Sequence, residues 1–465
     1  MNSYYDGLNQ KLLHAIPTNA RKVLELGCAN GRLGQRYKEL NRKSRWVGID
    51  IAASAVTEAS QVLDEAHQLD IDASELSHLG SGFDVIVIGD LLEHLKSPEA
   101  VLDKLYNLSS PNAVLVCCLP NMAHLSVIER MICGDMSYDS MGLLDRTHTR
   151  FFSPSSAVKM FLDSGWLPDI CDQYDAPPRN SEFLNSVIGA ATALGVPKQT
   201  ALGQLSLYQM IVRCQKWDMA ILKEQGPMAP FSVIVPVNRP WQYDLNILRS
   251  PGLKEVNAEI IPVLNASSAA DAYQTGAAKA KNHWKIIAHQ DVYFPAGSGL
   301  AMARHLGNLT AKGATASAVG FAGLEERADG STVMAGMVID RKRLFKYSTS
   351  DAASSIDEFA VALHSEAQVK IDPRLGWHMW GTDLCLQAKQ NLSQYSSRVV
   401  DIPLFHNSTN DYALPSEFHL SVETLFAKYK NLYLINTLCG RFSTQSHRKS
   451  SDHSPDREEK MIKAC

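Results

Sequence analysis

The stretch VLELGCANGRLG, residues 23–34, decides the fold of the first half of this chain. A short apolar run leads into a turn that holds Gly27, Ala29 and Gly31, and a helical pattern follows. Glycine permits positive φ and lets a ligand approach the backbone closely, while the N-terminus of the next helix offers free N–H groups. A glycine turn alone is equally typical of an ordinary connection between a strand and a helix. The neighbouring segments are needed to tell whether it binds a ligand.

Four apolar runs between residues 21 and 120 alternate with helical patterns. They read KVLEL (22–26), RWVGIDI (45–51), FDVIVIGD (83–90) and AVLVCCLP (113–120). Because they are apolar throughout and do not alternate, they predict parallel strands that crossover helices bury on both faces. The later run LYQMIVRC (207–214) is expected to close the same sheet. The pattern predicts an α/β fold.

The second of these runs ends in Asp50, about 20 residues beyond the glycine turn, where an acid can accept from both ribose hydroxyls. Such an acid is compatible with a nicotinamide cofactor and with S-adenosylmethionine. A dinucleotide fingerprint needs G-x-G-x-x-G to seat a pyrophosphate, and GCANG lacks that frame. Glu25 would also sit badly beside a phosphate, whereas a ligand with an ammonium group tolerates it. These residues favour S-adenosylmethionine over a nicotinamide oxidoreductase.

Two longer segments carry a family resemblance. They are GFDVIVIGDLLEHLKSPEAVL (82–102) and LPNMAHLSVIERMICGDMSYDSMGLLDRTHTRFFSPSS (119–156). With the glycine turn they resemble class I S-adenosylmethionine-dependent methyltransferases, in particular the ubiquinone-type and methyltransferase-23-like groups. The resemblance implies a Rossmann-like seven-stranded sheet. It also implies the cofactor-binding residues: Glu25, Gly27, Ala29, Gly31, Asp50, Asp70, Gly89, Asp90 and Leu91.

Three histidines are candidates for the base that a hydroxyl acceptor would need. The methyl carbon of a sulfonium is an electrophile, so the protein mainly has to align the acceptor and exclude water. His94, His124 and His148 lie in the segments that carry the resemblance, and we nominate His124 and His148 as catalytic. A structural histidine bonded to the backbone is an equally good interpretation of each.

A second alternation of strands and helices follows residue 230. FSVIVPV (231–237), EIIPVLN (259–265) and WKIIAHQDVYF (284–294) predict part of a nucleotide-binding α/β layer, with ligands beyond the carboxyl ends of the strands. Residues 218–230 lack a strong period and are expected to be a linker between domains 1–217 and 231–441. The polar residues 442–465 are expected to form a disordered tail.

These residues resemble GT-A glycosyltransferases of family 2, in the group whose metal motif reads H-Q-D-V-Y. The resemblance implies a nucleotide-sugar donor and a divalent cation, Mn2+ or Mg2+, with Asp291 and His406 as metal ligands and Asp383 in WGTDLCLQAK as base. Two departures matter: His289 replaces the first carboxylate of D-x-D, and Asn265 stands where a uridine-binding acid is often found.

The composition narrows the partners. A net charge of −4 gives no basic field for nucleic acid, no apolar run approaches the length of a transmembrane segment, and nine scattered cysteines are typical of a cytoplasmic protein. The composition predicts a cytoplasmic protein. Because the chain joins regions that resemble two kinds of transferase, these resemblances imply a bifunctional enzyme that acts on a saccharide or glycolipid-linked acceptor in surface-polysaccharide biosynthesis. The alternative is a methyltransferase whose second domain is a non-catalytic sugar-binding module.

Overall fold

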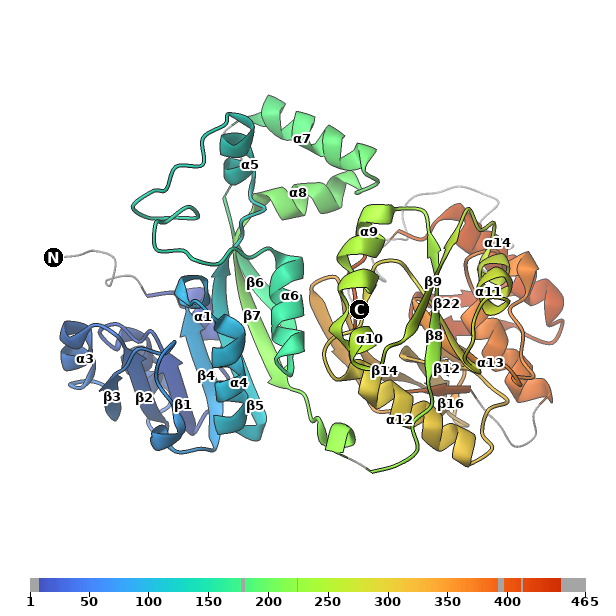
Figure 1. Ribbon diagram of the computed structural model, residues 1–465, viewed down its shortest axis with the longest axis horizontal. Coiled ribbons are helices and arrows are strands. Elements are labelled where there is room, and N and C mark those ends of the chain that lie inside the picture. The colour runs from blue at the N-terminus through green and yellow to red at the C-terminus, as the bar shows by residue number, and fades with distance from the viewer. Residues whose placement is uncertain (1–7, 177–179, 224, 392–396, 411–412, 445–465) are drawn as a thin grey trace.

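The computed structural model describes residues 8–176, 180–223, 225–391, 397–410 and 413–444 (Figure 1). The N-terminal part forms a seven-stranded sheet in the order β3-β2-β1-β4-β5-β7-β6. Its strands are β1 (Lys22–Leu26), β2 (Arg45–Asp50), β3 (Glu65–Gln68), β4 (Phe83–Gly89), β5 (Ser109–Pro120), β6 (Trp166–Asp175) and β7 (Leu207–Lys216). The four apolar runs of the sequence are the strands β1, β2, β4 and β5, as expected.

The strand pairing sets the position of the loop that follows β1. β1 lies between β2 and β4, parallel to both, and β4 pairs with β5 in parallel. β7 was expected to close the sheet, but it lies between β5 and β6 and runs antiparallel to both, so β6 forms the edge. The carboxyl ends of β1, β2 and β4 meet at one side, where ligands of open α/β sheets bind.

Eight helices of the described chain accompany this sheet. They are α1 (Gln10–Ala15), α2 (Arg32–Leu40), α3 (Ala53–Ala59), α4 (Pro98–Leu108), α5 (Leu125–Ile132), α6 (Pro154–Asp163), α7 (Ser181–Ala193) and α8 (Lys198–Ser206). The sequence explains where α6 begins: its N-terminus has a capping box between Ser153 and Ser156 and a proline in the first turn. In Figure 1, α5, α7 and α8 stand together above the sheet.

The C-terminal part has a mixed α/β structure with several sheets. One seven-stranded sheet has the order β16-β19-β12-β18-β10-β8-β9, a six-stranded sheet follows the path β11-β20-β14-β13-β17 with β15 beside β14, and β21 and β22 form a hairpin. The strands are β8 (Phe231–Val237), β9 (Glu259–Leu264), β10 (Trp284–Ala288), β11 (Val292–Tyr293), β12 (Val319–Gly320), β13 (Ala322–Glu326), β14 (Thr332–Asp340), β15 (Arg343–Lys346), β16 (Ser350–Ala353), β17 (Ser355–Ile356), β18 (Ala360–His364), β19 (Ser397–Val399), β20 (Leu404–His406), β21 (Leu434–Thr437) and β22 (Gly440–Ser443).

The helices of this part are α9 (Pro240–Leu245), α10 (Pro251–Glu255), α11 (Ala269–Ala277), α12 (Ser298–Ala311), α13 (Trp380–Asn391) and α14 (Ser416–Lys428). The expected parallel arrangement holds for β9, β8 and β10, whereas β18 pairs antiparallel with β10. The predicted tail begins too early, because Phe442 lies in β22 and packs into a hydrophobic cluster. Residues 445–465 of that tail lie outside the described residues.

The two parts share one hydrophobic core. Tyr293, Met337, Ile339 and Phe405 belong to the same cluster of buried side chains as the strands and helices of the N-terminal sheet. A hydrogen bond also joins the two parts: the Ile170 amide of β6 donates to the Lys342 carbonyl oxygen, between β14 and β15, at 2.8 Å. We refer below to residues 8–217 as the first module and to residues 231–444 as the second module.

The segment predicted as a linker is packed between the modules. Leu222 adjoins the hydrophobic clusters of both, and the Ala229 amide donates to the Ala303 carbonyl oxygen at 2.9 Å. Apolar contact on both sides gives this connection little freedom to swing. Among the described residues, no helix has the length and apolar character needed to cross a bilayer.

Candidate active site

The loop after β1 holds three left-handed residues in alternation. Gly27, Ala29 and Gly31 have φ of 69°, 46° and 78°. At Gly31 a Cβ would lie only 2.9 Å from a methyl carbon of Val62, so this position needs glycine for space as well as conformation. The left-handed conformation costs an alanine roughly 1–2 kcal/mol, and Ala29 adopts it nevertheless. Contacts from outside the loop therefore hold Ala29 in place.

Asp50, the last residue of β2, supplies those contacts. Its Oδ2 accepts the Ala29 amide at 2.9 Å, and its Oδ1 accepts the Ala52 amide at 2.9 Å. A carboxylate oxygen has two lone pairs, so each oxygen can accept a further hydrogen bond from a ligand hydroxyl. The position of Asp50 beside the loop is the one that the sequence suggested for a ribose-binding acid.

Glu25 lies inside β1 and is buried. Its Oε2 accepts the indole N–H of Trp46 at 2.7 Å. Burial raises the pKa of Glu25 to about 8, with a smaller contribution from the nearby negative charge of Asp50. The carboxyl group therefore carries a proton at neutral pH, and a positive charge brought beside it would favour its ionised form.

The loop after β4 (residues 89–91) lies beside the loop after β1 (residues 27–31), and the name cofactor pocket is used below for the residues of these two loops. Leu91 contacts the loop after β1, since a Cβ on Gly27 would lie 3.6 Å from its methyl carbons. Asp90 has φ of 48° and accepts from the Gln209 side-chain amide at 2.8 Å. Burial raises the pKa of Asp90. The structure thus brings Gly89, Asp90 and Leu91 to the same edge as the glycine turn, and it adds Gln209, which the sequence did not single out.

Asp70 is less closely tied to this pocket. It follows β3, its side chain is exposed, and its Oδ1 accepts the Asp72 amide at 3.1 Å. The neighbouring Leu69 amide donates to the Asp50 carbonyl oxygen at 3.0 Å, so the segment does run beside β2. A role of Asp70 beside the adenine stays a prediction.

His124 has a structural position. It caps the N-terminus of α5, where its Nδ1 accepts the Ser126 amide at 3.2 Å. Its other ring nitrogen lies 3.3 Å from the Ala176 carbonyl oxygen, and the side chain is buried. Both ring nitrogens have protein partners, as the structural interpretation of this histidine expects, and the nomination of His124 as a base stays a prediction that these contacts do not favour.

His148 belongs to a cluster that the sequence did not predict. Ligand atoms of Glu93, His94 and His148 lie within 4.8 Å of one another. Nδ1 of His148 lies 3.0 Å from the Leu143 carbonyl oxygen, which leaves Nε2 available. Within the described chain, Glu93 Oε2 is buried without a hydrogen-bond partner, and burial raises the pKa of Glu93 far above its usual value. Such a group can move a proton or hold a cation, and the EHL and RTHTRFF motifs were the signals for it.

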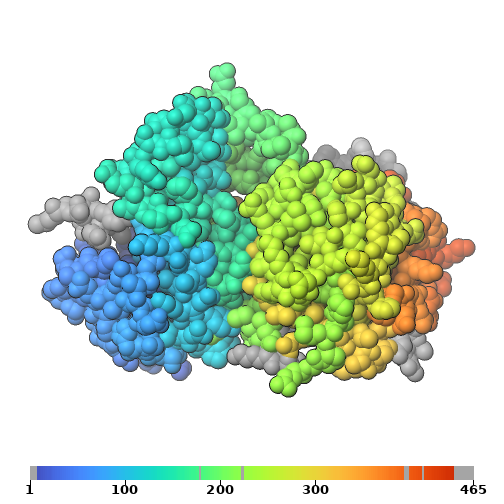
Figure 2. Space-filling view, viewed as in Figure 1, coloured from blue at the N-terminus to red at the C-terminus, as the bar shows by residue number. Residues whose placement is uncertain are grey.

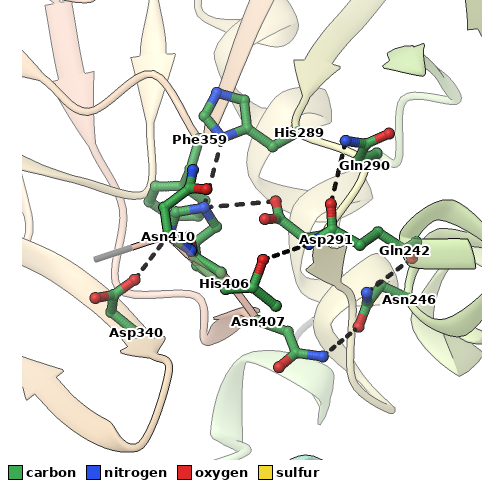
Figure 3. Close-up of polar contacts among 12 residues, drawn as sticks. Gln242, Asn246, His289, Gln290, Asp291, Asp340, Phe359, His406, Asn407 and Asn410 are labelled. Carbon is green, nitrogen blue, oxygen red and sulfur yellow. Dashed lines mark hydrogen bonds and ion pairs between the residues drawn. The ribbon is translucent and has the colours of Figure 1, made fainter. Parts of the chain in front are cut away.

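A second cluster lies in the second module (Figure 3). His289 follows β10, Asp291 precedes β11 and His406 ends β20, and their ligand atoms lie within 4.8 Å of one another. Nδ1 of His289 is 3.4 Å from Nε2 of His406, and the same Nε2 is 3.5 Å from Asp291 Oδ1. Asp340 at the end of β14 lies 2.9 Å from the other ring nitrogen of His406. The tertiary structure confirms that the predicted Asp291 and His406 are neighbours.

The electrostatics of this cluster follow from burial and from the two carboxylates. Burial lowers the pKa of His289 to about 4. Burial would also lower the pKa of His406, but Asp291 and Asp340 outweigh it and raise that pKa to about 10. The positive charge of His406 in turn lowers the pKa of Asp291 to about 2, against the effect of burial. A divalent cation would take the place of the His406 proton, with imidazole and carboxylate ligands of the kind that zinc and manganese accept.

Asp383, nominated as a base, occupies a different environment. It lies in the first turn of α13 and is fully buried. Its Oδ1 accepts the Tyr429 hydroxyl at 2.8 Å, and its Oδ2 accepts from Gln387 at 2.7 Å and Lys428 at 2.8 Å. With its oxygens engaged by α14 and by its own helix, Asp383 has the surroundings of a structural acid. Its role as a base stays a prediction that these surroundings do not favour.

Replacing Asp383 by asparagine is expected to lower the free energy of unfolding by about 2 kcal/mol, because the new amide N–H group faces buried donors, while Lys428 keeps its ion pair with Asp372. Urea denaturation measures this difference. Glu423→Gln on the exposed face of α14 is the matched control and should change the free energy by under about 0.5 kcal/mol. Unaltered stability of the Asp383 variant would contradict the structural role.

The sheet order and the loop after β1, closed by Asp50 at the end of β2, give the N-terminal part a Rossmann-like α/β fold. Residues 24–115 match the family model "Methyltransferase domain". Two curated relatives, both named ubiquinone biosynthesis O-methyltransferase, come from Psychrobacter arcticus and Psychrobacter cryohalolentis. They are each 30% identical to this chain, over 157 and 155 residues. These matches support the methyltransferase resemblance of the first half of the sequence.

The extent of these matches is limited. Each curated relative is matched over 31% of this chain, and the chain spans 59% and 58% of their lengths. A solved S-adenosylmethionine-dependent methyltransferase from Archaeoglobus fulgidus is 16% identical with a TM-score of 0.33, over 46% of this chain and 97% of that one. The plantazolicin methyltransferase BpumL in complex with SAH is 17% identical with a TM-score of 0.30, over 45% of this chain and 80% of that one.

Proposed function

We propose that the first module binds S-adenosylmethionine and transfers its methyl group to a hydroxyl group. The observation that carries this proposal is the loop after β1, in which Asp50 holds Ala29 in the left-handed conformation and still has lone pairs free for a ribose. Glu25, which lies in β1 next to this loop, suits a ligand with an ammonium group. The O-methyltransferase names of the curated relatives support oxygen as the acceptor atom.

The chain's own part in this reaction is alignment and proton transfer. S-adenosylmethionine supplies the electrophilic methyl group, and the walls formed by the loops after β1 and β4 orient it. The hydroxyl acceptor loses its proton as the new carbon–oxygen bond forms. In our proposal His148, whose Nδ1 has a backbone partner, accepts this proton through its other ring nitrogen, and Glu93 lies in the same cluster.

Titration of S-adenosylhomocysteine into the wild-type protein tests the proposal directly. We expect binding with one equivalent of ligand and a dissociation constant in the micromolar range that such cofactors show, about 1–100 μM. Titration of NADH under the same conditions should give no heat. Absence of S-adenosylhomocysteine binding by a folded protein would overturn the proposed function.

We propose as a second function that the second module uses a divalent cation to handle a nucleotide sugar, as a GT-A-like glycosyltransferase would. The cluster of His289, Asp291 and His406 favours this function, since a cation there would neutralise a leaving diphosphate. A saccharide or glycolipid-linked acceptor common to both modules, in surface-polysaccharide biosynthesis, is part of this proposal. The free cysteines among the described residues are compatible with a cytoplasmic location.

Asp291→Ala is expected to remove one equivalent of bound metal, because it takes away the only carboxylate among the three ligands. Equilibrium dialysis against Mn2+ and against Zn2+, followed by elemental analysis, measures the stoichiometry. His148→Ala is the matched control, since it alters the cluster of the first module and should leave this equivalent in place. Equal metal content in Asp291→Ala and the wild type would contradict the prediction.

A UDP-sugar titration with and without Mn2+ separates the two versions of the second function. Manganese-dependent binding that is lost in Asp291→Ala supports a glycosyltransferase. Binding of a saccharide without metal supports the alternative of a non-catalytic sugar-binding module.

A further inference from the structure

The hairpin formed by α7 and α8, residues 181–206, is here called the cap. It lies beyond the carboxyl end of β5, where Asn121 donates from its side chain to the Gln204 and Leu207 carbonyl oxygens at 3.1 and 2.8 Å. α5 packs against both cap helices through one hydrophobic cluster, which contains Leu125, Ile188, Ala201 and Leu205. The cap therefore stands on the side of the sheet where the cofactor loops lie (Figure 1).

The cap is connected to the cofactor pocket through β7. This strand begins at Leu207, directly after α8, and its third residue is Gln209. Gln209 donates to Asp90 Oδ1 at 2.8 Å, and Asp90 follows β4 in the wall of the pocket. Only two residues of β7 separate α8 from Gln209, so a movement of the cap would be transmitted to Asp90.

The second module contacts the tip of the cap. The indole N–H of Trp241 donates to the Leu194 carbonyl oxygen at 3.3 Å. The guanidinium group of Arg239 lies against Gly195, where a Cβ would stand 2.7 Å from Nε and 2.9 Å from Cζ. Gly195 has φ of 83°, so the turn between the two cap helices presents bare backbone to Arg239. Figure 2 shows the cap beside the part of the second module that contains α9.

The segment that makes these contacts, residues 238–241 at the start of α9, is itself anchored. Gln290 Oε1 accepts the Asn238 amide at 3.0 Å and the Arg239 amide at 2.8 Å. The Arg239 side chain also donates to the Thr409 hydroxyl at 3.4 Å. Gln290 lies between His289 and Asp291 in the sequence, so residues 238–241 are bonded to the segment that carries the cation cluster.

We propose that residues 238–241 are a clamp through which the second module holds the cap in place over the acceptor side of the methyltransferase pocket. Arg239 is the positioning residue of this clamp, and it acts through the backbone of Gly195. The statement that the cap covers the acceptor side rests on the methyl transfer proposed above. The clamp itself is inferred from the contacts of Arg239 and Trp241 with the tip of the cap. Through these contacts the second module sets the position of the cap of the first module.

Hydrogen exchange of the full chain, measured by mass spectrometry without cofactor, tests the clamp. In Arg239→Ala we expect exchange in α7 and α8 to accelerate by at least about fivefold, because the cap tip loses its contact with the second module. Peptides from β1 and β4 should keep their wild-type rates. Gln290→Ala should accelerate the same cap peptides, since it releases residues 238–241 without touching the cap.

The matched control is Arg343→Ala. Arg343 of β15 pairs with Asp169 of β6 at 2.7 Å, so it is another arginine of the second module that contacts the first, away from the cap. Its loss should leave the exchange of α7 and α8 unchanged. Unchanged cap exchange in Arg239→Ala, or equal acceleration in Arg343→Ala, would overturn the clamp. Because no cofactor is present, failure of S-adenosylhomocysteine to bind the wild type would refute the methyltransferase proposal without altering this result.

Discussion

Asp50→Ala is expected to weaken the binding of S-adenosylhomocysteine by at least about 100-fold, which corresponds to about 3 kcal/mol. The substitution removes the acceptor proposed for the ribose hydroxyls. It also removes the hydrogen bonds that hold the amides of Ala29 and Ala52, so Ala29 loses the contact that keeps it in the left-handed conformation. Isothermal titration at pH 8 measures the difference.

Two variants bracket this result. Asp50→Asn keeps one acceptor oxygen and should show a smaller loss, whereas Asp70→Ala changes an exposed side chain and should alter the affinity by only a few-fold. Circular dichroism checks that each protein is folded. Wild-type affinity in a folded Asp50→Ala protein would show that this acid does not contact the cofactor.

The affinity for S-adenosylhomocysteine is expected to rise about tenfold for each pH unit between pH 6 and pH 8 and then to level off. Burial raises the pKa of Glu25 to about 8, so the empty pocket holds a proton on this carboxyl group. A ligand ammonium group favours the ionised form, and binding therefore releases the proton. Titrations in buffers of different ionisation enthalpy measure both the affinity and the released proton.

Glu25→Gln is the control, because it keeps an acceptor for the Trp46 indole and cannot ionise. Its affinity should not vary over this pH range. The stability of the empty wild-type protein should change in the opposite sense: folded Glu25 keeps its proton between pH 4.5 and about 8 while the unfolded chain loses it, so the free energy of unfolding falls as pH rises through this window. If the affinity of the wild type did not change with pH, Glu25 would not interact with the ligand ammonium group.

The strands around the cofactor pocket could be predicted because their signals are local. β1, β2, β4 and β5 are apolar runs that end in turn residues, and Asp50 follows the glycine turn at a spacing that one βαβ unit sets. The order of β7 and β6 could not be predicted in this way, since it depends on pairing between strands far apart in the sequence. A sequence pattern shows that a strand is buried, but not which strand lies beside it.

The histidines show where sequence reasoning reached its limit. His124 and His148 lie in equally suggestive motifs, yet tertiary contacts use both ring nitrogens of His124 and place His148 in a cluster with Glu93. Hydrogen-bond partners of a side chain come from distant segments, so residue type alone cannot tell a structural histidine from a reactive one.

The sequence by itself was enough to predict a methyltransferase-like first half, a glycine turn with Asp50 as its candidate ribose acid, and Asp291 and His406 as candidates for one site. Only the tertiary structure decided that Asp340 orients His406, that Asp383 is held in a separate buried network, and that Arg239 reaches the cap of the other module. The physical reason is one of range. Strand periodicity and turn chemistry act over a few neighbouring residues, whereas burial, ion pairing and the contacts between modules depend on how the whole chain packs.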